Sequence, residues 1–478
     1  MRLTEDSRAW WTLAGACGGL FLLMLDSTAV TLALPDVERE LDASAAQIQW
    51  VANAYLLVIA ALVVTAGRLG DIAGRKRVYL VGLATFAAGS VIAATAPDAG
   101  VLISGRALQG AGAAPVLGLS LALVSSVFPA ERQATAIGIW TAVSSVALGV
   151  GPLVGGALVE LDWRLIFWIN IPLIAAGFAI TSIAAPESRD ETAPRRLDWL
   201  GLVALGAGLS TIVFAFVESD RWGLGDARTL GLVGAGILIL AAFLAIERRV
   251  RTPIVELDLF KNGPYFGATA AAFALVGAYW VVIFFQPQYL QGVLGYSPIE
   301  AGLLILPLTV PMIVISPFAG RLIDRFGARG LMTVGMVLAT AGLIVQTQVE
   351  TGSGYGDLFL GFLLFGIALG CVYAPMSSAA MAAMPAEKAG IAAGVLAMNR
   401  LLAGAIGLAA TGAVFQSIRS DDLAGGATRD AAFAHGLAEA LWVPVVLTLA
   451  GAILTWAFVR SGDRPAKATP THHHRYHL

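Results

Sequence analysis

Charged residues are scarce in this sequence. Asp, Glu, Lys and Arg make up 13% of the 478 residues, hydrophobic residues make up 58%, and the mean hydropathy is +0.78. Soluble domains are about one quarter charged, so this composition excludes an ordinary soluble protein and indicates an all-α integral membrane protein. The formal net charge of -2 provides no long-range field that would attract nucleic acid. We therefore expect a lipid bilayer around the chain and no nucleic-acid partner.

Cysteine is rare, and the motifs of common enzyme classes are missing. Cys17 and Cys371 each lie in an apolar run, which favours buried free thiols over a disulfide or a metal site. The sequence contains no phosphate-binding Walker loop, no zinc-binding HExxH and no GxSxG nucleophile elbow. We predict that the protein is not an enzyme and uses neither a metal nor a cofactor.

Long apolar runs are what the sequence has in abundance. About fourteen of them are long enough to cross roughly 30 Å of hydrocarbon as helices. Gly and Pro interrupt several runs, which membrane helices accept as kinks and close-packing points. The expected spans are 10–34, 47–66, 78–96, 101–124, 134–158, 165–185, 199–217, 230–247, 266–287, 299–319, 330–349, 357–381, 391–415 and 437–459.

Lys and Arg are distributed unevenly among the loops. If the N-terminus is cytoplasmic, about 22 of the 30 Lys and Arg residues fall in cytoplasmic loops and tails and about 6 in outer loops. Arg106 and Arg400 remain within the membrane. This bias predicts a multi-pass protein of the cytoplasmic (inner) membrane with both termini in the cytoplasm, because the helix count is even.

One loop sequence occurs twice. "GRLGDIAGRK" at 67–76 returns as "GRLIDRFGAR" at 320–329, each time after a predicted helix. Repeated halves are typical of transporters, in which two similar bundles move about a central site. The repeat predicts two six-helix bundles with two inserted helices between them. The expected parts are a first bundle at 1–185, the two inserted helices with flanking cytoplasmic loops at 186–262, a second bundle at 263–460 and a disordered cytoplasmic tail at 461–478.

Two opposite charges are expected at one depth in the membrane. Asp26 lies roughly 13 Å below the outer end of the first helix, and Arg106 roughly 12 Å below the outer end of the fourth. Intramembrane charges usually face the bundle interior and pair, so we expect an Asp26–Arg106 pair, direct or bridged by water. A static pair that only fixes packing is the alternative. An exchangeable proton on Asp26 explains better why a chain would keep so costly a group.

Other residues are candidates for gates between the bundles. Glycines permit tight turns and close helix contacts, and an acid beside cations can form a breakable contact. Topogenic positive charge and ordinary tight packing are the alternatives. The candidate gating residues are Gly67, Asp71, Gly74, Arg75, Lys76, Asp324 and Arg325 in the repeated loops, and Gly151, Pro152, Gly155 and Gly156 in the fifth helix.

A further set of polar and aromatic residues is expected to line a substrate cavity. An alternative role for Arg400 is structural: its guanidinium would only donate hydrogen bonds to the carbonyl groups of a kinked helix. Tyr289 and Trp442 fit better as anchors at the membrane interface. The candidate cavity residues are Asn53, Tyr55, Gln109, Tyr279, Trp280, Gln286, Tyr373, Met376, Asn399 and Arg400.

These motifs together resemble the major facilitator superfamily, and specifically its fourteen-helix drug:proton antiporter family. "LDSTAVTLALP" (25–35), "GRLGDIAGRKR" (67–77) and "RALQGAGAA" (106–114) are similar to that family's motifs in the first helix, the loop after the second and the fourth helix. "GVGPLVGG" (149–156) matches the antiporter motif of the fifth, and "WRLIFWINIP" (163–172) the stretch before the sixth. The resemblance implies the major facilitator fold, a proton-transfer role for Arg106 and efflux of drugs or toxic metabolites.

The expected function is proton-coupled export of lipophilic small molecules, by alternating access and with the proton gradient as energy source. Asp26 is the only acid that we place firmly inside the membrane, which favours neutral or monovalent substrates. We expect a monomer. The alternatives are a proton symporter that imports a small nutrient, and a receptor or scaffold without transport.

Overall fold

The computed structural model describes residues 4–190, 197–250, 253–350, 352–385 and 388–459. Over these residues the secondary structure is helical, without strands. Thirteen helical stretches are long and apolar enough to cross a membrane. One of them, Leu306–Gln346, contains a turn at Gly327, where φ is 74°. Divided at this turn, it provides the tenth and eleventh expected spans, and the fold class is confirmed. The expected tail at 461–478 lies outside the described residues.

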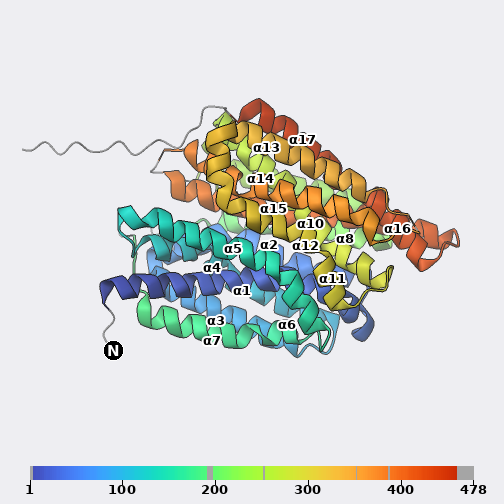
Figure 1. Cartoon of the computed structure of the whole chain (residues 1–478), viewed down its shortest axis with the longest axis horizontal. Coiled ribbons are helices and arrows are strands. Elements are labelled where there is room, and N and C mark those ends of the chain that lie inside the picture. The colour runs from blue at the N-terminus through green and yellow to red at the C-terminus, as the bar shows by residue number, and fades with distance from the viewer. Residues whose placement is uncertain (1–3, 191–196, 251–252, 351, 386–387, 460–478) are drawn as a thin grey trace, which may run out of the picture.

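The chain forms two helical bundles with a hairpin between them in sequence (Figure 1). The first bundle contains α1 (Glu5–Glu40), α2 (Ala45–Ala73), α3 (Arg75–Ala94), α4 (Ala99–Ser125), α5 (Ala130–Val159), α6 (Leu165–Trp168) and α7 (Asn170–Ala184). The hairpin consists of α8 (Trp199–Trp222) and α9 (Ala227–Glu247). The second bundle contains η1 (Leu257–Lys261), α10 (Gly263–Gly292), α11 (Pro298–Leu304), α12 (Leu306–Ile315), η2 (Ser316–Phe318), α13 (Ala319–Gln346), α14 (Tyr355–Ala382), α15 (Ala389–Ala424), α16 (Arg429–Ala440) and α17 (Trp442–Phe458).

The helices extend beyond the apolar runs that predicted them. The first expected span ends at 34, but α1 continues through Pro35 to Glu40. Hydropathy marks only the part of a helix that lies in hydrocarbon, whereas hydrogen bonding carries the helix on into the polar region. Polar caps then end the helices, as in the capping box of Ser44 and Gln47 at the start of α2.

One of the two expected interface anchors is wrong. Trp442 is 45% exposed, as an anchor should be, but Tyr289 is fully buried and packs on Phe433 with ring centroids 6.2 Å apart. The helix α16 begins well before the expected span and covers Tyr289, which sequence periodicity did not reveal.

The two bundles touch closely at the end of the molecule where α1 finishes, which we call the Glu40 end. Gln291 Nε2 of α10 donates to the carbonyl oxygen of Leu32 in α1 at 3.1 Å. A side-chain carbon on Gly412 of α15 would lie only 2.4 Å from the amide of Gln49 in α2. At the opposite, Glu5 end, Phe318 and Phe326 are 50% and 58% exposed. The structure is thus closed between the bundles at the Glu40 end.

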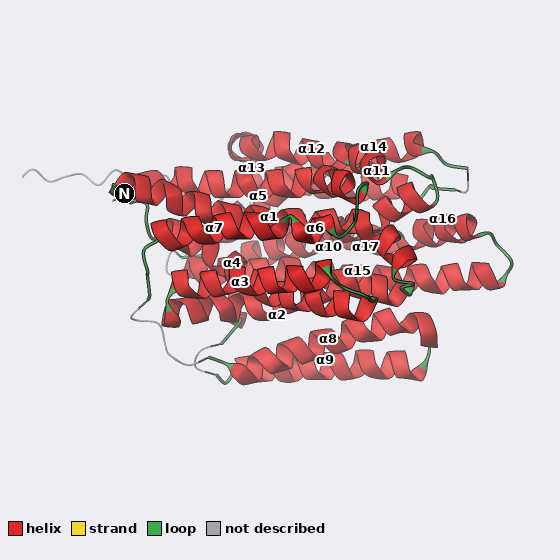
Figure 2. Ribbon diagram, turned by 90° about the horizontal axis from the view of Figure 1, so that it is seen from below, coloured by secondary structure: helices red, strands yellow, loops and turns green. Residues whose placement is uncertain are grey.

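The inserted hairpin lies along one edge of the molecule, as Figure 2 shows. Its first helix, α8, contacts both α2 of the first bundle and α15 of the second. A side-chain carbon on Gly206 would lie 3.7 Å from Ala61 of α2. The second helix, α9, packs on α8 and leaves Ile237 and Leu238 exposed, in keeping with a lipid-facing position.

Candidate functional site

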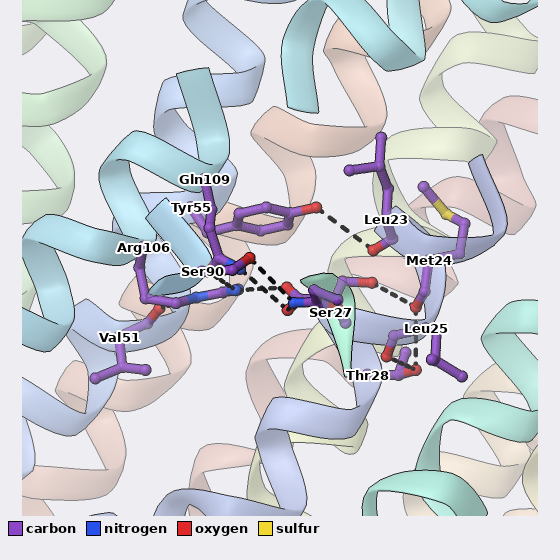
Figure 3. A network of polar contacts seen from close by, with 12 residues as sticks. Leu23, Met24, Leu25, Ser27, Thr28, Val51, Tyr55, Ser90, Arg106 and Gln109 are labelled. Atoms are coloured by element: carbon purple, nitrogen blue, oxygen red, sulfur yellow. Dashed lines mark hydrogen bonds and ion pairs between the residues drawn. The ribbon is translucent and has the colours of Figure 1, made fainter. Parts of the chain in front are cut away.

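A buried ion pair joins α1 to α4. Arg106 Nη1 lies 2.5 Å from Asp26 Oδ2, and each residue is 1% exposed. The two helices start at opposite ends of the molecule, so the pair lies at the common depth that residue counting predicts. Figure 3 shows Arg106 and Gln109 pointing from α4 toward the stretch of α1 around Ser27. The structure therefore brings the two intramembrane charges into direct contact.

Both members of the pair have further hydrogen-bond partners. Asp26 Oδ1 accepts from Asn170 Nδ2 at 2.8 Å and from Gln109 Nε2 at 3.2 Å. Arg106 Nη1 also donates to Gln109 Oε1 at 2.7 Å, and Arg106 Nε donates to the carbonyl oxygen of Val51 at 3.2 Å. A charge buried in a low-dielectric interior is costly unless such bonds satisfy it. These bonds bring together side chains or carbonyl groups of α1, α2, α4 and α7.

Two members of this network, Ser90 and Asn170, were not predicted. Ser90 Oγ accepts from Gln109 Nε2 at 2.8 Å and from Asn170 Nδ2 at 3.3 Å, and both residues are fully buried. Asn170 carried a usable signal, because it is a lone amide within the apolar stretch "WINIP". Ser90 carried none, since a hydroxyl in a helix often bonds its own backbone.

Two predicted cavity residues, Asn53 and Tyr55, belong to α2, and Tyr55 lies beside the ion pair. The guanidinium carbon of Arg106 lies 4.2 Å from the ring centroid of Tyr55, and Tyr55 Oη donates to the carbonyl oxygen of Leu23 at 3.4 Å. Asn53 is fully buried, and neither its amide nitrogen nor its amide oxygen has a hydrogen-bond partner among the described residues. An unpartnered buried amide is costly, so Asn53 is the residue of this group best suited to contact a polar ligand atom.

Some of the predicted residues of the second bundle lie around Arg400. The guanidinium of Arg400 lies 4.8 Å from the ring centroid of Tyr373 and donates to the hydroxyl of Ser377. Asn399 Nδ2 donates to the carbonyl oxygen of Thr269 at 2.8 Å. Over the described residues Arg400 has no ion-pair partner, and its Nε has no hydrogen-bond partner. Arg400 therefore presents a positive charge that no described carboxylate neutralises.

The remaining predicted cavity residues lie on α10 and α14. The rings of Tyr279 and Trp280 pack edge to face with centroids 6.0 Å apart, and Tyr279 Oη has no partner among the described residues. Gln286 Nε2 donates to Gln346 Oε1 at 2.9 Å within the second bundle, and Met376 is fully buried.

A pocket of about 190 Å³ lies between the bundles at the Glu40 end. Its walls combine aromatic, amide and charged side chains, and no predicted cavity residue lines it. The lining includes Gln49, Gln288, Phe285, Phe415, Arg419 and Phe433.

The first copy of the repeated loop is held together by several polar contacts. Arg75 contacts Asp71 Oδ1 through Nε at 2.9 Å and Nη2 at 2.8 Å, next to the turn at Gly74, where φ is 115°. Lys76 Nζ donates to the carbonyl oxygen of Ser182 at 2.6 Å. A side-chain carbon on Gly67 of α2 would lie 3.9 Å from the carbonyl oxygen of Gly118 in α4, an ordinary van der Waals distance, so no close contact requires glycine there.

Glu187, which was not predicted, completes this loop. Its carboxylate accepts from the backbone nitrogens of Lys76 and Arg77 at 3.1 and 3.2 Å. It thus caps the N-terminus of α3, where backbone N–H groups lack helix partners.

The second copy of the loop differs. Gly327 repeats the positive φ of Gly74, but Asp324 and Arg325 are exposed. Asp324 forms no ion pair with any described residue, and Arg325 lies over the ring of Phe326 at 5.3 Å. The sequence repeat is therefore not a repeat of contacts in this conformation.

The predicted glycines of α5 pack against both bundles. A side-chain carbon on Gly151 would lie 1.8 Å from Thr28 Oγ1, and one on Gly155 would lie 2.7 Å from the backbone of Ala29, both in α1. One on Gly156 would lie 2.4 Å from the carbonyl oxygen of Pro298, at the start of α11. Pro152 completes the contact, because its carbonyl oxygen approaches Gly302 of α11 in the same way. These small residues form the closed contact at the Glu40 end.

Residues 16–408 match the family model of the Major Facilitator Superfamily. The chain belongs to this superfamily. It is accordingly a transporter rather than an enzyme, and a multi-pass protein of a cell membrane.

Curated relatives of this major facilitator protein support the resemblance to the drug:proton antiporters. The tetracenomycin C resistance and export protein of Streptomyces glaucescens is 35% identical over 93% of this chain and 84% of its own length. The puromycin resistance protein of Streptomyces alboniger is 35% identical over 97% of this chain and 94% of its own. A multidrug efflux pump of Mycolicibacterium smegmatis is 31% identical over 86% and 81%.

Solved structures confirm the fold. A bacterial homolog of the human lysosomal transporter Spinster, in an inward-facing and unoccupied conformation, matches with a TM-score of 0.68 at 17% identity, over 96% of this chain and 98% of that one. A D-xylose-proton symporter matches with a TM-score of 0.67 at 15% identity, over 95% and 98%. At these identities the likeness concerns the major facilitator fold alone.

Proposed function

We propose that this transporter exports lipophilic small molecules in exchange for protons, and that Asp26 carries the exchanged proton. The observation that supports the proposal most is the buried Asp26–Arg106 pair with its shell of amide and carbonyl partners. A chain that needed only packing would gain as much from apolar side chains at these positions. Export rests on the relatives, whose names describe resistance to, or efflux of, drugs and antibiotics.

Protonation of Asp26 changes the balance of the network. When the carboxylate takes up a proton, it loses its charge, and the attraction to Arg106 falls. Arg106 keeps its bonds to Gln109 Oε1 and to the Val51 carbonyl, and its position over the Tyr55 ring. The guanidinium therefore remains partly satisfied while the proton is bound, which lets the pair separate without leaving a bare buried charge.

The proton site is linked to the closed contact through α1. Thr28 and Ala29, which pack on Gly151 and Gly155, follow Asp26 by two and three residues on the same helix. If α1 shifts when the Asp26–Arg106 attraction is lost, its contacts with Gly151 and Gly155 of α5 must change. This continuity supports a cycle in which proton uptake from outside accompanies the outward-open form, and proton release inward accompanies substrate capture.

The Glu5 end is the cytoplasmic end in this proposal, because Lys and Arg gather in the loops of that end. Both termini then lie in the cytoplasm, and the structure is closed toward the outside. The transporter acts as a monomer and uses the proton gradient without a cofactor.

Dye transport in energised inside-out vesicles tests the proposal. Ethidium is added to wild type, to Asp26→Asn and to the control Asp226→Asn, which keeps a helix cap at an exposed turn. A pH dye in the same vesicles records protons. We expect wild type and the control to take up ethidium and release the proton gradient, and Asp26→Asn to do neither.

Two other outcomes separate the alternatives. Full transport by Asp26→Asn would remove Asp26 from the proton pathway. Proton-linked uptake of a nutrient by right-side-out vesicles, with no dye movement in either orientation, would favour a symporter, and absence of both would favour a receptor or scaffold.

A further inference from the structure

Two carboxyl groups meet at the base of the α8–α9 hairpin, far along the chain from Asp26. Asp198 caps the start of α8, where its Oδ1 accepts from the backbone nitrogen of Gly201 at 2.8 Å. Glu247 is the last residue of α9, and its Oε2 accepts from the backbone nitrogen of Val255 at 3.0 Å. Glu247 is only 4% exposed, so it is a second deeply buried acid besides Asp26.

The second oxygens of the two carboxyl groups lie close together. A side-chain carbon on Gly201 would lie 2.3 Å from Asp198 Oδ2 and 2.8 Å from Glu247 Oε1, so both oxygens border the same glycine. Both are buried, and no N–H or O–H group of the described residues donates to either. Each of these oxygens is thus left with the other carboxyl group beside it and without a donor. An ionised carboxylate only accepts hydrogen bonds, so a bond between two of them requires a proton on one.

No described cation offsets a double negative charge at this point. Asp198 and Glu247 form no ion pair with any described residue. The other charged groups of the described helix end and linker are exposed or paired: Arg248 and Arg249 are exposed, Lys388 pairs with Glu256 at 2.7 Å, and Lys261 pairs with Asp258 at 2.6 Å. Two adjacent carboxylates without a cation repel each other, and such pairs in proteins share a proton.

We propose that Asp198 and Glu247 bind one proton between them, as a second proton site separate from Asp26. The proton lies on the line from Asp198 Oδ2 to Glu247 Oε1, while the other two oxygens keep their backbone donors. This inference rests on the contacts of the hairpin alone and is independent of the proposed transport function.

The shared proton joins three segments of the chain. Through Asp198 it holds the start of α8, through Glu247 the end of α9, and through Val255 the segment that leads into the second bundle. The helix α8 also contacts α2 of the first bundle and α15 of the second. The site therefore holds in place the segment that connects the hairpin to the second bundle. Loss of the proton would leave two like charges in contact and loosen this junction.

Infrared spectroscopy of the full-length protein in lipid tests the site. A protonated carboxylic acid has a C=O stretching band that ionised carboxylates and amides lack. At neutral pH we expect this band in wild type and in Asp26→Asn, and its loss in Glu247→Gln. Glutamine has the shape of glutamate, and its amide can donate to Asp198 without a proton from solvent.

Asp198→Asn is the matched second variant. Asparagine also caps a helix, so α8 should fold as before, and the band should again disappear. Retention of the band in both amide variants, or its absence from Asp26→Asn, would overturn the proposal. The two carboxylates could instead hold a calcium ion, and the band would then appear in Asp26→Asn only after calcium is removed by a chelator. That result would overturn the proposal too. If Glu247→Gln fails to fold, Asp198→Asn decides the question.

Discussion

Asn170 Nδ2 lies 2.8 Å from Asp26 Oδ1, although 144 residues separate them in the chain. The two residues belong to α7 and α1, which pack side by side. The bond gives the buried carboxylate a neutral donor in addition to Arg106. The charge of Asp26 is thus held by two helices besides its own.

Asn170→Leu tests this bond. A hydrogen bond to a charged group contributes about 1.5–3 kcal/mol, so we expect the free energy of unfolding to fall by about that amount and dye transport to weaken. Thermal unfolding in detergent and vesicle transport measure the two effects. Gln348→Leu is the control, because among the described residues that side-chain amide bonds only the neighbouring Thr347 hydroxyl. Equal behaviour of the two variants would mean that Asn170 contributes nothing special to Asp26.

Arg106→Lys tests the shape of the cation rather than its charge. Lysine keeps the positive charge but cannot reproduce the guanidinium's simultaneous contacts with Asp26, Gln109 and the Val51 carbonyl. We expect a loss of at least about tenfold in transport rate, equivalent to roughly 1.4 kcal/mol, with normal expression. The exposed Arg132→Lys is the control and should transport as wild type does. Normal transport by Arg106→Lys would show that charge alone suffices.

Gly156→Ala tests the closed contact at the Glu40 end. The new methyl group would lie 2.4 Å from the carbonyl oxygen of Pro298, so the bundles must separate there. We expect faster labelling of Gln291→Cys by a membrane-impermeant maleimide, against a low background because Cys17 and Cys371 are buried. Gly231→Ala, which meets nothing within 4 Å, should not change the labelling rate. Unchanged labelling in Gly156→Ala would contradict the closed contact.

The two copies of the repeated loop should respond differently to the same substitution. Asp71→Asn removes the partner of Arg75, whereas Asp324 forms no ion pair with any described residue. We expect Asp71→Asn to lower the thermal midpoint of unfolding and Asp324→Asn to leave it unchanged. Equal losses would show that Asp324 is paired in the protein in solution.

The pair of Lys388 and Glu256 predicts a pH effect outside the membrane. The hydrogen bond that Lys388 Nζ donates to the Glu256 carboxylate raises the pKa of the Lys388 ammonium. The folded state therefore holds this proton more tightly than the unfolded state, so the stabilisation is present below the ordinary lysine pKa of about 10.4 and is lost as pH rises through the raised value. Lys388→Gln should unfold at a slightly lower temperature at neutral pH and at the wild-type temperature in strong alkali. Lys261→Gln, whose pair with Asp258 lies within one helical turn, should show a smaller difference.

Much of the candidate site could be predicted because membrane burial makes charge expensive. Asp26 and Arg106 stand out in apolar runs, and helical rise alone places them at one depth. Ser90 and Glu187 could not be found in this way. A hydroxyl in an apolar helix and an acid in a loop are both common, and only the packing of distant segments gives them partners.

The sequence by itself determined the number of membrane helices, the two bundles with an inserted hairpin, and the depth of Asp26 and Arg106, because hydrocarbon thickness and helical rise act on each segment separately. Only the tertiary structure decided that Asn170 shares the carboxylate of Asp26, that the repeated loops differ in their contacts, and that Glu247 meets Asp198. These outcomes depend on which helices lie side by side and at which end the bundles touch. Hydrogen bonds form across distances of about 3 Å, and chain positions far apart reach that distance only through the packing of the whole molecule.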